Sequence, residues 1–193
     1  NEQVEIAARV PELERAGPRV LIHAAAAHPA KMYPLERWAE AVKVLQARLN
    51  ATCYFTGAAQ DIALYDQLQA LAGVKGVNLA GKLSLRESLA LYHRMDLAVC
   101  VDSGPAHMAA AAGVPTVAIF GPTDPGRWRP WGERHAVVFD ASLKACPCVI
   151  NDTCPERPCL TSLDASVIIE SALKTFWSAG EIPRSARERL QAH

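Results

Sequence analysis

The sequence predicts an α/β protein built on a doubly wound, Rossmann-like parallel sheet of about six strands. Six short apolar or β-branched runs recur along the chain, and segments with helical periodicity lie between most of them. Strands that alternate with helices favour a parallel sheet covered on both faces, with ligands at the carboxyl ends of the strands. With 193 residues, half of them apolar, the chain can bury one sizeable core.

The predicted strands are short runs separated by helical or turn-forming segments. In chain order they are Arg19–Ala24, Ala51–Gly57, Gly76–Gly81, Leu97–Val101, Thr116–Gly121 and Ala136–Asp140.

The predicted helices carry start and stop signals. The helix over 34–49 opens on Pro34, a favoured first-turn residue, and the helix over 60–73 ends on Gly73, a C-cap residue. Ser84 and Glu87 have the spacing of a capping box for the helix over 84–95. A last amphipathic helix is predicted over Leu163–Trp177.

We expect three parts along the chain. Residues 1–18 read as a polar interdomain helix or linker within a longer protein, and residues 19–177 as the Rossmann-like domain. Residues 178–193 read as a polar C-terminal tail or crossing helix, with few contacts to that domain.

Composition excludes several classes of partner. Twenty basic residues match twenty acidic ones, so charge gives no reason to expect nucleic acid. No apolar run reaches the ~18–20 residues of a membrane span, and the chain does not open on a secretion signal. We therefore expect a cytoplasmic protein.

The run VDSGPAHMAAAAGVP, from Val101, is the most informative stretch. It predicts a turn after a strand, with Pro105 at the first helical position and Ser103 or Asp102 as the cap. Gly104 lets a ligand approach the backbone, and the helix start is an anion site to which His107 can add a donor. The alternative is an ordinary capped helix with one surface histidine, because such turns are common.

Two further features favour a ligand site over that alternative. Residues 121–125, GPTDP, make another turn at the same carboxyl edge, and Lys31 lies in the loop between the first strand and the first helix. A lone lysine is usually a solvated charge, but in such a loop of a doubly wound sheet it lies near the ligand more often.

Residues 101–125, VDSGPAHMAAAAGVPTVAIFGPTDP, resemble the signature of glycosyltransferase family 9, the ADP-heptose:lipopolysaccharide heptosyltransferases and their relatives. That signature has Asp-Ser/Thr-Gly-x-x-His, a helix of small residues, Gly-x-Pro, and then Gly-Pro-Thr-x-Pro. The resemblance extends more loosely over residues 19–177. It implies the C-terminal, donor-binding half of a GT-B glycosyltransferase with two Rossmann-like domains.

The resemblance implies roles around the diphosphate and the sugar of the donor, an ADP-heptose or similar nucleotide sugar. Asp102 would hold sugar hydroxyls, and Lys31 would neutralise the charge that develops on phosphate. The diphosphate would be held by Ser103, Gly104, the helix start at Pro105, and His107.

The resemblance also implies contacts to the nucleoside. Asp61 lies where an acidic residue of the family touches the ribose, and Leu83 lies where an apolar side chain is near the base. One departure concerns the loop Ala24–Ala27, where the family often has glycine, serine or threonine. There Ala25 and its neighbours could offer only backbone N–H groups to the donor.

Partners and activity follow from the same resemblance. It implies an inverting transferase of lipopolysaccharide or cell-envelope glycan synthesis that requires no metal, because a cation and a helix start stabilise the leaving group. The general base and the glycolipid or lipid-linked acceptor would belong to an N-terminal domain, at the inner face of the inner membrane with peripheral contact. This chain alone would bind donor without transferring sugar. The alternative is a non-catalytic nucleotide-binding regulatory or scaffold module.

Two other motifs keep alternatives open. Cys146, Cys148, Cys154 and Cys159 could hold structural zinc, remain reduced thiols or form disulfides, since their spacing is not that of zinc ribbons. Trp128, Pro130 and Trp131 could line an acceptor cleft or serve loop and core packing.

Overall fold

The computed structural model describes residues 2–143, 148, 154 and 156–178. Its six strands form one parallel sheet in the order β3-β2-β1-β4-β5-β6. The strands are β1 (Arg19–His23), β2 (Thr52–Phe55), β3 (Val77–Asn78), β4 (Leu97–Val101), β5 (Thr116–Ile119) and β6 (His135–Val138). The predicted fold class is confirmed.

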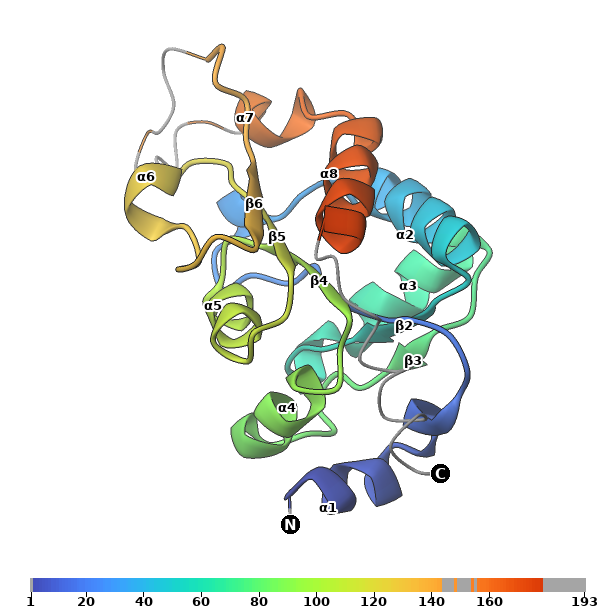
Figure 1. Cartoon of the computed structure of the whole chain (residues 1–193). Helices are drawn as coiled ribbons and strands as arrows, with labels where there is room; N and C mark the ends of the chain where they lie inside the picture. The colour runs from blue at the N-terminus through green and yellow to red at the C-terminus, as the bar shows by residue number, and fades with distance from the viewer. Residues whose placement is uncertain (1, 144–147, 149–153, 155, 179–193) are drawn as a thin grey trace.

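Helices cover both faces of this sheet (Figure 1). The α-helices are α1 (Glu2–Arg9), α2 (Leu35–Leu49), α3 (Ile62–Ala72), α4 (Leu85–Tyr92), α5 (Gly104–Ala111), α6 (Pro125–Trp128), α7 (Pro158–Thr161) and α8 (Ala165–Ser178). Short 3-10 helices are η1 (Pro11–Glu14), η2 (Pro29–Lys31) and η3 (Ala59–Asp61).

Each face of the sheet has its own hydrophobic cluster. In β1, Val20 and Ile22 belong to the cluster under α2, α3 and α8, whereas Leu21 belongs to the cluster under α1, α4 and α5. Successive side chains of a strand point to opposite faces, and all five residues of β1 are buried. Both faces of the sheet are therefore core.

The strand order changes direction beside β1. The chain runs outward from β1 to β2 and β3, then returns so that β4 pairs with the other side of β1. In open parallel sheets this reversal leaves a crevice at the carboxyl ends of the two strands, where ligands bind. Loops that follow β1 and β4 are therefore placed to form a site.

The start of α4 and the end of α3 follow the sequence signals, whereas the start of α2 is shifted by one residue. Ser84 and Glu87 form the predicted capping box, and Gly73 ends α3 with a φ of 64°. Pro34 is the N-cap of α2 and not its first helical residue. The reason is its ψ of 134°, which is extended, so Pro34 contributes only its carbonyl, the acceptor for Trp38 N at 3.0 Å.

The segment before the sheet packs on the domain. Ile6, Val10 and Leu13 are buried in the cluster under α1, α4 and α5, and the Tyr54 hydroxyl donates to Glu12 O at 2.7 Å. Residues 179–193 of the predicted tail lie outside the described residues. Within the described part of the chain, no helix is long and apolar enough to cross a membrane.

Candidate functional site

A cavity of about 730 Å³ lies at the crevice beside β1. Its walls come from the loops after β1, β2 and β4 and from α4 and α5. The lining residues are His23, Ala25, Ala26, Ala27, His28, Lys31, Thr56, Gly57, Ala58, Gln60, Asp61, Leu85, Ser88, Tyr92, Asp102, Ser103, Gly104, Pro105 and Met108. Seven of the predicted site residues are in this set, and Leu83 and His107 are not.

An ion pair between Lys31 and Asp102 lies at the charged end of the cavity. Lys31 Nζ is 2.6 Å from Asp102 Oδ2, and the Thr123 hydroxyl donates to the same oxygen. Asp102 directly follows β4, and its N–H donates to Ile119 O at 2.9 Å. Since Asp102 is only 6% exposed, these two donors balance its buried charge.

Thr123 belongs to the GPTDP turn that follows β5. The prediction that this turn shares the carboxyl edge with Asp102 is confirmed, although Thr123 itself was not predicted as a site residue. A signal existed, because Thr123 is the one hydroxyl in a turn already assigned to that edge.

The start of α5 carries no side-chain cap. Ser103 is the N-cap residue, which is one of the two predicted alternatives, but no side chain caps the helix. The Ser103 hydroxyl donates to Val101 O at 3.0 Å, and the Asp102 carboxylate is bound as above. Gly104 and not Pro105 is the first helical residue. No atom lies within 4 Å of a Cβ built on Gly104, so this helix start is open to an anion.

His107 and Leu83 lie outside the lining. His107 is a half-buried residue of α5, where Pro105 and Met108, three residues apart on one face, line the cavity instead. Leu83 packs against the cluster under α4 and α5. Leu85, two residues further, lines the cavity and is 75% exposed.

A chain of neutral polar groups lines the cavity between β1, β2 and α4. His23 Nδ1 is 3.2 Å from Thr56 Oγ1, which is 3.3 Å from the Tyr92 hydroxyl. Burial lowers the pKa of His23 to about 4, so the imidazole is neutral near pH 7. None of these three residues is among the predicted site residues. The available signal was that His23 ends β1 and Thr56 directly follows β2.

The loop after β1 is held by Tyr65 of α3. The Tyr65 hydroxyl accepts from Ala24 N at 3.1 Å and from Ala25 N at 3.4 Å, and donates to Thr56 O at 2.7 Å. For Ala24 and Ala25, the prediction that the N–H groups of this loop remain for the donor therefore needs correction. Ala25 lines the cavity, but its N–H group is directed at a phenol oxygen.

Asp61 lines the cavity where the chain turns into α3. Its Oδ2 accepts from Ala58 N at 2.8 Å, and a Cβ on Gly57 would lie 2.7 Å from that oxygen. A glycine at position 57 therefore lets this carboxylate fold back over the loop after β2.

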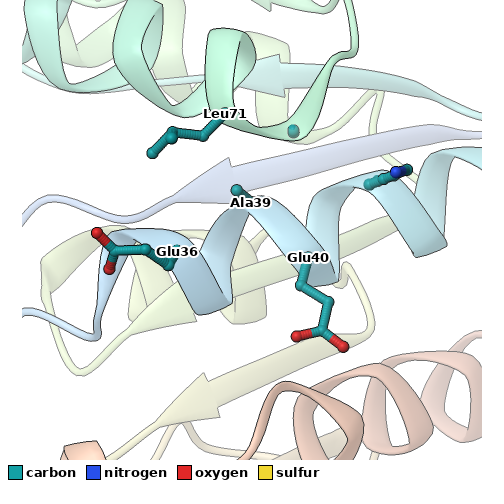
Figure 2. A pocket seen from close by; sticks show the side chains of 6 residues that line it. Glu36, Ala39, Glu40 and Leu71 are labelled. Atoms are coloured by element: carbon teal, nitrogen blue, oxygen red, sulfur yellow. The ribbon is translucent and has the colours of Figure 1, made fainter.

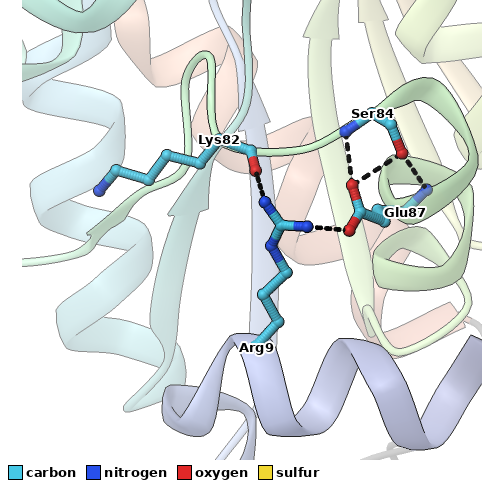
Figure 3. A network of polar contacts seen from close by, with 4 residues as sticks. All are labelled: Arg9, Lys82, Ser84 and Glu87. Atoms are coloured by element: carbon cyan, nitrogen blue, oxygen red, sulfur yellow. Dashed lines mark hydrogen bonds and ion pairs between the residues drawn. The ribbon is translucent and has the colours of Figure 1, made fainter.

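Arg9 of α1 reaches the turn before α4 (Figure 3). Its Nη2 donates to Lys82 O at 2.8 Å, and its Nη1 pairs with Glu87, the capping-box residue of α4. Residues before the sheet thus contact the segment that leads to Leu85.

The structure describes three of the four clustered cysteines and both tryptophans between β5 and β6. Cys148 and Cys154 are half-buried free thiols and Cys159 is buried, whereas Cys146 lies outside the described residues. Among the residues described, no group of three or more metal-ligating side chains is assembled. Trp128 and Trp131 are 50% and 91% exposed, so neither serves core packing.

A second, smaller hollow of about 280 Å³ lies between α2 and α3. Glu36, Ala39, Glu40 and Leu71 line it, and the Glu40 carboxylate points away from Leu71 (Figure 2). None of the predicted site residues is there. The cavity beside β1 is therefore the candidate site.

Comparison with known proteins identifies the family of the chain. The sequence model of the family described as glycosyltransferase family 9 (heptosyltransferase) matches residues 3–159. The chain is 33% identical over 130 residues to lipopolysaccharide heptosyltransferase 3 of Escherichia coli K12, covering 66% of this chain and 38% of that protein. It is 28% identical over 120 residues to the lipopolysaccharide core heptosyltransferase OpsX of Haemophilus influenzae, covering 62% and 35%.

A solved structure shows the same fold. The E. coli ADP-heptose lps heptosyltransferase II superposes with a TM-score of 0.77 at 22% identity, covering 93% of this chain and 52% of that one. The chain thus spans a little over a third of the length of these two curated relatives and about half of the solved structure.

Proposed function

Because the chain belongs to glycosyltransferase family 9, we propose that its cavity beside β1 binds the nucleotide-sugar donor of an inverting heptosyl-type transferase. The observation that carries the proposal is the Lys31–Asp102 ion pair beside the uncapped start of α5. A cation, a carboxylate and the positive end of a helix meet there, which suits a ligand with both phosphates and hydroxyls. A donor such as ADP-heptose has that chemistry.

The charged end of the cavity suits the reacting bond. In transfer, the bond between the anomeric carbon and the diphosphate oxygen breaks, and negative charge develops on that oxygen. Lys31 and the start of α5 would stabilise this charge, while Asp102 would accept hydrogen bonds from sugar hydroxyls. These groups supply the stabilisation without a metal, so we expect donor binding to be independent of divalent ions.

The part of the cavity formed at the starts of α3 and α4 suits the nucleoside. Asp61 would accept a hydrogen bond from a ribose hydroxyl at the carboxylate oxygen that does not bond to Ala58 N. Leu85 of α4 would lie beside the base, in the place that the resemblance implied for Leu83, because Leu85 lines the cavity.

Sugar transfer also needs a general base and a binding site for the acceptor. The attacking hydroxyl must lose a proton to a general base, which we place in the half of the protein that the relatives have and this chain does not span. The exposed Trp128, with the Arg127 guanidinium 5.3 Å from its ring centre, follows the turn that contacts Asp102. An aromatic ring beside a cation suits a charged glycolipid acceptor of lipopolysaccharide core synthesis, met at the inner face of the inner membrane.

Calorimetric titration of ADP into the chain tests the proposal. We expect saturable binding that excess chelator does not abolish, and Lys31→Met should weaken it about tenfold or more, as expected for a lost charged hydrogen bond. Lys43→Met is the matched control, since Lys43 lies beside the hollow between α2 and α3. Equal affinities for the two variants would refute the placement of the phosphates, and loss of binding that magnesium restores would refute the metal-independent mechanism.

A further inference from the structure

Arg9 joins the segment before the sheet to one wall of the cavity (Figure 3). The two terminal nitrogens of its guanidinium have different partners: Lys82 O at 2.8 Å, and the Glu87 carboxylate. The residue that donates and the residues that accept are more than 70 positions apart in sequence. This segment is anchored on the domain, because Ile6 of α1 and Val10, which follows α1, are buried.

The Glu87 carboxylate links Arg9 to the start of α4. Its Oε1 faces Arg9, and its Oε2 accepts from both the backbone N and the hydroxyl of Ser84 at 2.7 Å. Ser84 in turn accepts from Glu87 N at 3.3 Å. One carboxylate therefore both closes the capping box and binds the arginine, which fixes the turn and the first residues of α4 together.

The segment held in this way is a wall of the cavity. Leu85 directly follows Ser84, and Ser88 N donates to Ser84 O at 2.8 Å; both Leu85 and Ser88 line the cavity. The turn itself depends on Gly81, whose φ is 69° and where a Cβ would lie 2.6 Å from Ala59 Cα. The close approach of Gly81 to Ala59 therefore restricts the backbone conformation of this turn.

The wall formed by α4 differs in charge from the end of the cavity that holds Lys31 and Asp102. The lining residues that α4 contributes are Leu85, Ser88 and Tyr92, and all three are uncharged. A flat nucleobase has apolar faces and no charge, so it fits against this wall, whereas phosphate fits at Lys31 and the start of α5.

We propose that Arg9 is a positioning residue for the nucleobase of the donor. It holds the turn over 81–84 and the first turn of α4, so that the wall made by Leu85 and Ser88 stands in place before the ligand arrives. Preorganisation of this kind raises affinity by removing the entropy cost of ordering the wall on binding. This inference rests on the donor site proposed above.

The test compares two probes that differ in the nucleoside. Calorimetry measures the affinities of ADP and of inorganic pyrophosphate for the wild-type chain and for Arg9→Gln. We expect the substitution to weaken ADP about fivefold, the range for an exposed but bridging ion pair, and to leave pyrophosphate within about twofold. Arg9→Lys keeps a charge near Glu87 but not the fork that also reaches Lys82 O, so it should restore ADP binding only in part.

Glu14→Gln is the matched control. It removes an ion pair with Arg94 at 3.5 Å, which joins the same N-terminal segment to the far end of α4. We expect it to lower the unfolding temperature about as much as Arg9→Gln and to leave ADP affinity unchanged. Equal weakening of ADP and pyrophosphate by Arg9→Gln, or no weakening of either, would overturn the proposal.

Hydrogen exchange tests the positioning role of Arg9 independently of donor binding. Amides of residues 82–88 should exchange faster in Arg9→Gln than in Glu14→Gln, with no ligand present. If the wild-type chain binds neither ADP nor pyrophosphate but these amides respond as expected, the donor site is wrong and the positioning contact stands. Unchanged exchange over 82–88 would overturn the positioning role even where ADP binds.

Discussion

Lys31 and Asp102 are 71 residues apart in sequence, and their charged atoms lie 2.6 Å apart in the structure. The pair forms because Lys31 follows β1 and Asp102 follows β4, two strands that are neighbours in the sheet. Each residue has a separate expected contact in the donor, phosphate for Lys31 and sugar for Asp102. In the proposed function, the bond between these two parts of the donor would therefore lie beside the pair.

Thr123 should matter through Asp102. Thr123→Val removes the hydroxyl that donates to the Asp102 carboxylate and keeps the shape of the side chain. We expect a loss of about 1–3 kcal/mol in unfolding free energy, since a buried charged acceptor loses a donor. Urea unfolding measures it. Thr123→Ser, which keeps the hydroxyl, should lose less than half as much, and equal losses would assign the effect to packing.

Tyr65 should stabilise the loop after β1 more than an ordinary buried phenol does. Tyr65→Phe leaves Ala24 N, Ala25 N and Thr56 O without this partner. We expect a cost of about 2–3 kcal/mol, because each lost hydrogen bond costs about 1 kcal/mol. Tyr33→Phe, which loses the bond to Leu163 O, is the comparison by thermal unfolding. A smaller cost for Tyr65→Phe than for Tyr33→Phe would contradict this role.

The neutral imidazole of His23 predicts a pH dependence of stability. Its pKa is lowered to about 4 by burial, below the value of about 6.5 for an exposed histidine. The unfolded chain thus binds a proton more readily, so the stability contribution is complete above about pH 6.5 and is lost as pH falls toward 4. The loss at the acid end is on the order of 3 kcal/mol.

His23→Gln isolates this contribution from that of the carboxylates. Urea unfolding at about pH 7 and about pH 4.5 should show a smaller fall in stability for the variant than for the wild-type chain. Equal falls in the two proteins would mean that His23 is not a buried neutral group.

Much of the fold was predictable, because each strand is a short apolar run flanked by helical or turn signals. β3 is the exception in length: six residues were predicted and Val77–Asn78 observed. There the Asn78 side chain accepts from Ala80 N at 3.1 Å and Gly81 turns the chain with a φ of 69°. Such local hydrogen bonds compete with the ladder and are not visible in the pattern of apolar residues.

The site was predictable only where the loops themselves carry the chemistry. Lys31 and Asp102 follow strands, so their common edge could be expected from a parallel sheet. Tyr92 instead reaches the cavity from a helix, and Tyr65 holds the loop after β1 from another. Their hydrogen-bond partners depend on how α3 and α4 pack. Helical periodicity shows that these residues face the sheet but not which polar atom they meet.

In the proposed site, Asp102 holds the sugar of the donor and Lys31 its phosphate. The most direct test is to measure by calorimetry the affinities of Asp102→Asn for ADP and for ADP-heptose. We expect the variant to bind ADP-heptose about tenfold or more weakly than the wild-type chain does, as for lost hydrogen bonds to a charged group. We expect it to bind ADP as well as the wild-type chain or better, because Lys31 is released from its partner. Equal weakening of both ligands, or no change in either, would show that Asp102 does not hold the sugar.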